Sequence, residues 1–114
     1  MTAVGPYTPI VRAGEWLVVS GQLGLRDGEL VHSVGAQTTQ AIANLATLLA
    51  GEGATLTDVV KTTVFLRHMD DFDVMNEAYV GAFSTHRPAR SAIGVAGLPR
   101  GALVEVEAWA RVAS

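Results

Sequence analysis

The last part of the chain, residues 103–112, alternates between small apolar side chains and larger, mostly polar ones. Successive side chains of a β-strand point to opposite faces of a sheet, so the pattern predicts a strand with one face packed against helices. The packed face consists of Val104, Val106, Ala108, Ala110 and Val112. The other face consists of Leu103, Glu105, Glu107, Trp109 and Arg111.

The second face of this strand permits two interpretations. An antiparallel sheet can leave one face in water, which would make these residues a solvated surface. Trp109, however, is a large apolar side chain in the middle of the face, and such a side chain favours cover. We therefore expect the face to receive another protein surface or a ligand.

The rest of the chain predicts a simple order of strands and helices. The first helix begins at a capping Ser33 and ends at Gly51, and the second begins at Asp70 or Asp71 and is broken by Pro88. The order β-β-β-α-β-α-β-β indicates one α+β domain, residues 1–114, with both helices on one face of the sheet. The expected strands are residues 9–12, 16–20, 29–31, 58–66, 89–96 and 103–112.

Periodicity assigns these elements their faces. The strand at 58–66 carries apolar residues on both faces, as expected in the middle of a sheet. The first helix has a polar face with almost no charge, which could pack against another part of the protein. The short connection 97–101 predicts that the last two strands are antiparallel neighbours. The side chains of the second helix expected to face the core are Phe72, Met75, Tyr79 and Phe83.

Composition narrows the possible partners. The 114 residues contain no cysteine, which excludes disulfides and cysteine nucleophiles. Eight Lys and Arg residues against eleven Asp and Glu residues argue against a binder of nucleic acid or of membrane surfaces. Charged residues make up only 17%, against about 25% in an average domain. This hints at a homo-oligomer that hides surface, although abundant alanine and valine would explain it equally well.

Targeting and metal-binding signals are absent from the sequence. There is no leader peptide and no apolar run long enough to span a membrane, so the expected location is the cytoplasm. His32, His68 and His86 do not have the spacing of a metal site, so no metal is expected.

Arginine and glutamate residues on the last strands form a candidate site. We expect Arg90 to lie on a strand next to Glu105 and Glu107, where a guanidinium could bind a carboxylate and a glutamate could activate water. The alternative is a structural ion pair between strands, which contributes roughly 0.2–1 kcal/mol and which spacing alone favours. Arg87 and Arg100 extend the basic group, which would suit one anionic ligand.

Several stretches, in order along residues 5–110, together resemble the RidA (YjgF-type) family of enamine/imine deaminases. The most specific are Pro88-Ala89-Arg90-Ser91 and Glu105-Val106-Glu107-Ala108. The others are Gly5-Pro6-Tyr7, Val19-Ser20-Gly21-Gln22, the strand at 58–66, Asp71-Phe72 with Asn76, Tyr79 and Phe83, and Leu98-Pro99.

The resemblance implies a chorismate-mutase-like fold with a mixed sheet, assembled as a homotrimer with ligand clefts between adjacent subunits. It implies hydrolysis of unstable acids such as 2-iminobutanoate and 2-iminopropanoate to 2-keto acids and ammonia, without a metal or an organic cofactor. The partners would be these small acids and further copies of the chain, with no nucleic acid and no membrane.

Residue by residue, the resemblance makes Arg90 the clamp for the substrate carboxylate and Glu105 the group that positions the attacking water. Glu107 is a weaker candidate for the second role. Many family members have a cysteine where Ala92 stands, so only the backbone is expected to act at that position. The residues matching cleft positions of the family are Tyr7, Ser20, Gly21, Asn76 and Ala92.

Two alternatives to the deaminase accompany the resemblance. The first is an endoribonuclease or translation inhibitor, an activity also attributed to the family. The acidic charge balance and the low aromatic content of 6% argue against strong binding of single-stranded RNA. The second is a trimer that binds small acids without catalysis.

Overall fold

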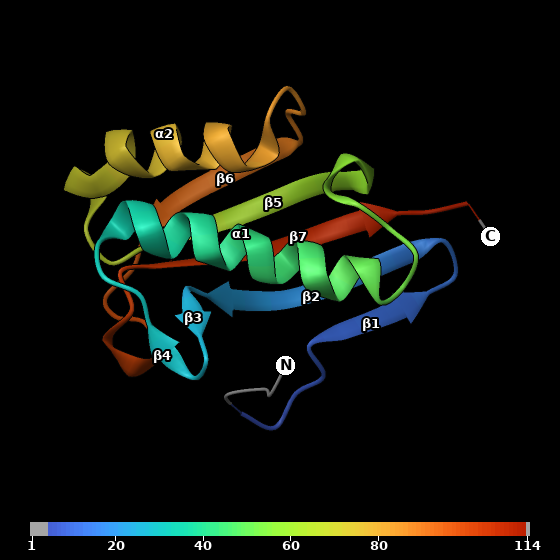
Figure 1. Cartoon of the computed structure of the whole chain (residues 1–114), viewed down its shortest axis with the longest axis horizontal. Coiled ribbons are helices and arrows are strands. Elements are labelled where there is room, and N and C mark those ends of the chain that lie inside the picture. Colours follow the sequence, from blue (N-terminus) through green and yellow to red (C-terminus); the bar gives the residue numbers. More distant parts are fainter. Residues whose placement is uncertain (1–4, 114) are drawn as a thin grey trace.

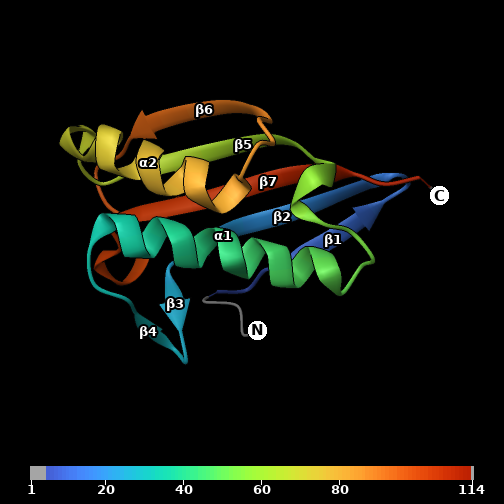
Figure 2. The same ribbon diagram turned by 45° about the horizontal axis from the view of Figure 1, so that its top comes forward.

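Two layers make up the fold: a five-stranded sheet and two helices that lie on one of its faces (Figure 1 and Figure 2). The structure is a computed structural model and describes residues 5–113. The helices are α1 (Val34–Ala50) and α2 (Phe72–Phe83). The strands of the large sheet are β1 (Ile10–Ala13), β2 (Trp16–Leu23), β5 (Val59–Leu66), β6 (Ala89–Gly94) and β7 (Val104–Arg111).

The sheet is mixed, and its order is β1-β2-β7-β5-β6. The prediction that the last two strands are neighbours is wrong: β7 lies between β2 and β5, while β6 pairs in parallel with β5 at the sheet edge. Parallel pairing follows because α2 carries the chain from the end of β5 back to the end where β5 begins. The connection 95–103 then passes the end of β5, where the Val95 amide donates a hydrogen bond to the Leu66 carbonyl.

The N-terminal hairpin of β1 and β2 is confirmed, but β2 is longer than predicted. A bulge between Val19 and Gln22 lets the strand bend and continue instead of ending. The single strand predicted at 29–31 is instead a small hairpin outside the large sheet. Its strands are β3 (Leu25–Arg26) and β4 (Glu29–Leu30), and the turn residues Asp27 and Gly28 have φ angles of 54° and 82°.

Helix α1 joins this small hairpin to the sheet. The hydroxyl of Ser33 accepts a hydrogen bond from the Ala36 amide, which confirms the predicted cap. The polar face of the helix is packed: the Asn44 side chain donates to the carbonyl oxygens of Leu23 and Leu25 at 3.0 Å each. Within residues 5–113, no helix combines the length and the apolar character needed to cross a membrane.

Helix α2 begins through a 3-10 turn, Met69–Asp71. Asp71 occupies the N-cap position as predicted, but its carboxylate makes no capping hydrogen bond. The face of the helix expected to point inward does so. Its residues are the buried Met75, Tyr79 and Phe83 and the half-buried Phe72.

The two faces of β7 differ as the alternation predicts. Val104, Val106, Ala108 and Ala110 are fully buried under the helices. On the other face, which we call the open face of the sheet, Trp109 remains 45% exposed. Its ring meets Trp16 edge to face, with 5.9 Å between the ring centroids. No helix of the described chain covers the open face (Figure 2).

Candidate functional site

The bulge in β2 brings Gly21 against Glu105 of β7. A Cβ atom added to Gly21 would lie 2.5 Å from Oε1 of Glu105, which is closer than the two atoms can approach. Because Gly21 has no side chain, the carboxylate of Glu105 can occupy this space. Sequence reasoning named both residues, and the structure brings them together.

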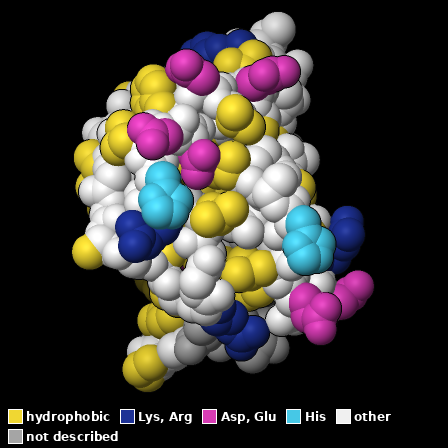
Figure 3. Space-filling model, turned by 90° about the vertical axis from the view of Figure 1, so that its left-hand side faces the viewer, with side chains coloured by type: hydrophobic (Ala, Val, Ile, Leu, Met, Phe, Trp, Pro, Cys, Tyr) yellow, Lys and Arg dark blue, Asp and Glu magenta, His cyan; other side chains and the backbone are white. Residues whose placement is uncertain are grey.

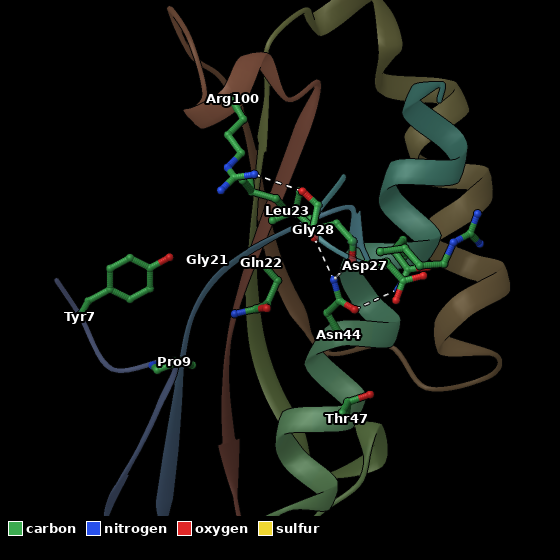
Figure 4. Close-up of a pocket in the computed structure, with 13 residues that line it drawn as sticks. Tyr7, Pro9, Gly21, Gln22, Leu23, Asp27, Gly28, Asn44, Thr47 and Arg100 are labelled. Atoms are coloured by element: carbon green, nitrogen blue, oxygen red, sulfur yellow. Dashed lines mark hydrogen bonds between the residues drawn. The ribbon is translucent and has the colours of Figure 1, made fainter. Parts of the chain in front are cut away.

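Ser20 binds the N-terminal segment through hydrogen bonds, next to Gly21 and Glu105. Its hydroxyl donates to the Thr8 carbonyl at 2.7 Å, and its amide donates to the Pro9 carbonyl at 2.8 Å. These bonds hold the segment so that Tyr7 lines the same cavity as Gly21 (Figure 4). We call this group the carboxylate half-site: Tyr7, Ser20, Gly21 and Glu105.

A cavity of about 500 Å³ opens beside the carboxylate half-site. Its walls come from the N-terminal segment, the bulged end of β2, the β3–β4 hairpin, α1 and the turn around Arg100 (Figure 4). Gln22 and Asn44 give it amide groups, and Arg100 donates to the Gly28 carbonyl at 3.1 Å. Sequence reasoning missed this cavity, because nothing in the sequence indicates that residues 25–30 fold against α1.

The environment of Glu105 makes its carboxyl group harder to ionise than an exposed one. Partial burial raises the pKa of Glu105, and the negative charge of Glu107, two residues along the same strand face, raises this pKa further. A carboxyl group with a raised pKa exchanges protons closer to neutral pH, as a general acid or base must.

Arg90 lies on the other side of the sheet, and the prediction that it stands beside Glu105 and Glu107 is wrong. It pairs in register with Thr62 of β5, whose side chain is buried under α2, so its own side chain points toward α2. The glutamates point to the open face, and β5 separates their strand from β6. The alternative of an ion pair between these strands is therefore also wrong.

The guanidinium of Arg90 packs on aromatic rings instead. Its Cζ atom lies 4.9 Å from the ring centre of Tyr79 and 5.7 Å from that of Phe72. Its Nη1 atom lies 3.9 Å from the sulfur of Met75. Within residues 5–113, no carboxylate forms a salt bridge with this arginine.

Asn76 and Ala92 belong to the same side as Arg90. Asn76 is on α2, and its Oδ1 atom is buried without a hydrogen-bond partner in the described chain. Such an atom is rare in folded proteins, and a donor from water, a ligand or a neighbouring molecule would satisfy it. Ala92 pairs with Val64 and packs against the core. We call this group the arginine half-site: Asn76, Arg90 and Ala92.

The basic group predicted from Arg87, Arg90 and Arg100 does not form. Arg87 donates to the carbonyl oxygens of Ser84 and His86 before β6, whereas Arg100 donates to Gly28 at the β3–β4 hairpin. The three side chains contact different segments because the whole length of β6 separates Arg87 from the turn that carries Arg100.

Comparison with known proteins shows what this arrangement is similar to. The model of the family described as Endoribonuclease L-PSP matches residues 1–112. A 2-iminobutanoate/2-iminopropanoate deaminase of Mus musculus is 44% identical over 111 residues, which are 95% of this chain and 82% of that protein.

Solved structures agree closely with the fold. RidA from the Antarctic bacterium Psychrobacter sp. PAMC 21119 superposes with a TM-score of 0.94 at 39% identity, over 97% of this chain and 92% of that one. TdcF of E. coli, solved with bound serine, gives a TM-score of 0.93 at 33% identity, over 97% and 91% of the two chains.

The chain is thus an α+β protein of the family described as Endoribonuclease L-PSP. Within it, the chain is a member of the RidA (YjgF-type) family, as the sequence motifs implied. Relatives carry the names of two different activities, an imine deaminase and an endoribonuclease.

Proposed function

We propose that this protein hydrolyses 2-imino and 2-enamino acids, such as 2-iminobutanoate and 2-iminopropanoate, to 2-keto acids and ammonia. The observation that carries the proposal is Arg90, a half-buried guanidinium without an acidic partner in the described chain. A guanidinium held in this way offers a fork of N–H groups to the carboxylate of a small acid. The related mouse protein bears the name of this activity.

The proposed substrate cleft lies between two copies of the chain. In one copy Arg90 and Glu105 belong to opposite faces of the sheet, so a single chain cannot bring both side chains to one ligand. The arginine half-site of one protomer would meet the carboxylate half-site of its neighbour in a homotrimer. The uncovered open face with Trp109 and the buried, unpaired Oδ1 of Asn76 support this assembly.

The proposed reaction uses one water molecule. Arg90 binds the substrate carboxylate, which orients the imine carbon toward a water held by Glu105 of the neighbouring protomer. Glu105 takes a proton as the water oxygen bonds to that carbon, and it returns the proton to the nitrogen. Glu105 then takes the proton of the new hydroxyl group and passes it to the nitrogen as the C–N bond breaks, which releases ammonia and leaves the carbonyl of the keto acid. No cofactor is required, since the imine carbon is already electrophilic.

A trapping assay tests the proposal. A pyridoxal-phosphate-dependent dehydratase generates 2-iminobutanoate from threonine, and semicarbazide captures whatever imine remains free. We expect the wild-type protein to lower the rate of capture in proportion to its concentration, with faster release of the keto acid. An unchanged capture rate together with tight binding of the keto acid would instead indicate a binding protein without catalysis.

The acidic limb of the pH profile tests the role of Glu105. Glu107 raises the pKa of Glu105, so replacing Glu107 with glutamine lowers that pKa, although burial still keeps it above the ordinary value. The base form then persists to lower pH. We expect the acidic limb of kcat/KM in the Glu107→Gln variant to move to lower pH, with the plateau little changed. A profile that does not move would contradict the assignment of Glu105 as the base.

Trp109 provides a test of the assembly. Covering its half-exposed side chain contributes about 1–1.5 kcal/mol in each subunit, so Trp109→Ala should raise the protein concentration needed for half-assembly of a trimer more than about tenfold. Trp109→Phe retains most of the apolar area and should remain close to wild type. Light scattering over a dilution series measures both variants. Equal assembly of wild type and Trp109→Ala would show that the open face is not an interface.

The description of the family favours a second candidate, an endoribonuclease. The net charge of −3 argues against it, since a nuclease must attract a polyanion. At the end of the molecule where α1 and α2 begin, acidic, basic and apolar side chains are interspersed (Figure 3). RNA cleavage that persists through purification and disappears in Arg90→Ala would favour this candidate over the deaminase.

A further inference from the structure

The surroundings of Arg90 contain a residue that the proposed reaction does not use. We propose that Tyr79, fixed by Thr62, is a positioning residue that holds the Arg90 guanidinium ready for a carboxylate. The inference deepens the proposed function and rests on it. It concerns how the clamp is kept in place before a ligand arrives.

Tyr79 is itself held rigidly. Its side chain is 3% exposed, and its hydroxyl shares a hydrogen bond of 2.7 Å with the hydroxyl of Thr62, which is fully buried. Thr62 lies on the inner strand β5 and pairs in register with Arg90. The ring and the guanidinium are therefore both fixed to neighbouring positions of the sheet.

The contact with Tyr79 leaves the donors of the arginine free. The Cζ atom lies 4.9 Å from the ring centre. A ring face attracts the cation electrostatically, so the N–H groups at the edge of the guanidinium remain available to donate hydrogen bonds to a ligand. A carboxylate partner within the chain would use those donors itself. Burial raises the pKa of Tyr79, so the ring remains neutral beside the cation.

This arrangement explains how a long side chain can act as a precise clamp. Arginine has several rotatable bonds, and a free arginine must give up that freedom when it binds a ligand. The rings of Tyr79 and Phe72 remove much of the freedom in advance. The expected ligand class is a small monocarboxylate with its carboxylate in the plane of the guanidinium.

The central experiment is a double-mutant cycle of Tyr79→Leu and Arg90→Ala, read by the affinity for pyruvate and by KM and kcat in the trapping assay. We expect Tyr79→Leu to raise KM and the pyruvate Kd about tenfold, with kcat nearly unchanged. In the Arg90→Ala background, the same change should have no further effect. An equal loss in both backgrounds would show that Tyr79 acts independently of the arginine and would overturn the inference.

Two conservative variants separate positioning from folding. Tyr79→Phe keeps the ring and should restore the wild-type KM, although the Thr62 hydroxyl loses its partner and thermal stability falls. If Tyr79→Leu does not fold, Phe72→Leu removes the half-buried second ring, and we expect a rise in KM of about threefold. If Tyr79→Leu folds and has the wild-type KM, the inference is overturned. If Tyr79→Leu does not fold, a wild-type KM in folded Phe72→Leu overturns it instead.

Side-chain NMR relaxation at Nε of Arg90 keeps this test independent of the proposed function. We expect the Arg90 side chain to be ordered in wild type and in Tyr79→Phe, and to be mobile in Tyr79→Leu. If Tyr79→Leu does not fold, the same mobility is expected in Phe72→Leu. Equal mobility in wild type and that ring-deleted variant would overturn the inference. If the protein turns over no imine but these order and binding differences hold, the proposed function fails and the positioning role stands.

Discussion

We expect the replacement of Arg90 with alanine to lower kcat/KM for 2-iminobutanoate about a thousandfold while the protein remains folded. In the proposed cleft the guanidinium binds the substrate carboxylate through two charge-assisted hydrogen bonds, which together contribute about 4 kcal/mol. Each 1.4 kcal/mol corresponds to roughly a factor of ten. The free energy of unfolding should change by only about 1 kcal/mol, because what this side chain loses within the chain is its contact with two rings.

The matched control for this prediction is Arg90→Lys. Lysine keeps the positive charge but lacks the planar fork, so a loss of about ten- to a hundredfold is expected. The trapping assay measures kcat/KM for all three proteins, and chemical denaturation measures their stability. If Arg90→Ala and wild type remove the imine at the same rate, Arg90 is not the carboxylate clamp.

We expect the addition of a single methyl group at Gly21 to lower kcat about a hundredfold, an effect typical of a catalytic group displaced by about 1 Å. The new Cβ atom would lie 2.5 Å from Oε1 and 2.6 Å from Cδ of Glu105, so the carboxylate must move away. The atoms it meets are the far end of a flexible side chain. The Tm of Gly21→Ala should therefore change little, although its activity falls.

Gly97→Ala is the control for this variant, because an added Cβ at Gly97 meets no atom within 4 Å. It should match wild type in both kcat and Tm. Glu105→Gln should reproduce the activity loss of Gly21→Ala, and combining the two changes should add little. A fully active Gly21→Ala protein would show that the position of the Glu105 carboxylate does not matter for catalysis.

The sequence predicts well the helices and strands in which each face has one environment, either buried or exposed, along its whole length. The alternation in β7 follows directly from a strand that is buried on one face only, and its four buried residues were expected. Val112, expected with them, lies beyond the strand and is only half-buried. The apolar run of β5 reflects its place inside the sheet. The faces of α1 and α2 are also correct, because a helix that packs on a sheet must bury one stripe.

The relation between strands could not be predicted in the same way. Periodicity shows that Arg90 and Ala92 share a face of β6, but it does not say which face of the sheet this is or which strand lies alongside. Both depend on the crossover through α2, which places β5 between β6 and β7. The bulge beside Gly21 adds one residue to β2. A glycine within a strand often marks a bulge, but the strand predicted at 16–20 stops before this signal. The sequence therefore grouped Arg90 with Glu105 and Glu107, which the fold places on opposite faces of the sheet.

Placing the two half-sites on opposite faces has a genetic consequence. A chain with Arg90→Ala still carries an intact Glu105, and a chain with Glu105→Gln still carries an intact Arg90. Neither should work alone, yet a mixed trimer of the proposed assembly would regain one complete cleft, where an intact Arg90 meets an intact Glu105. Two defective alleles expressed together should thus restore activity. They could not do so if each active site lay within a single chain.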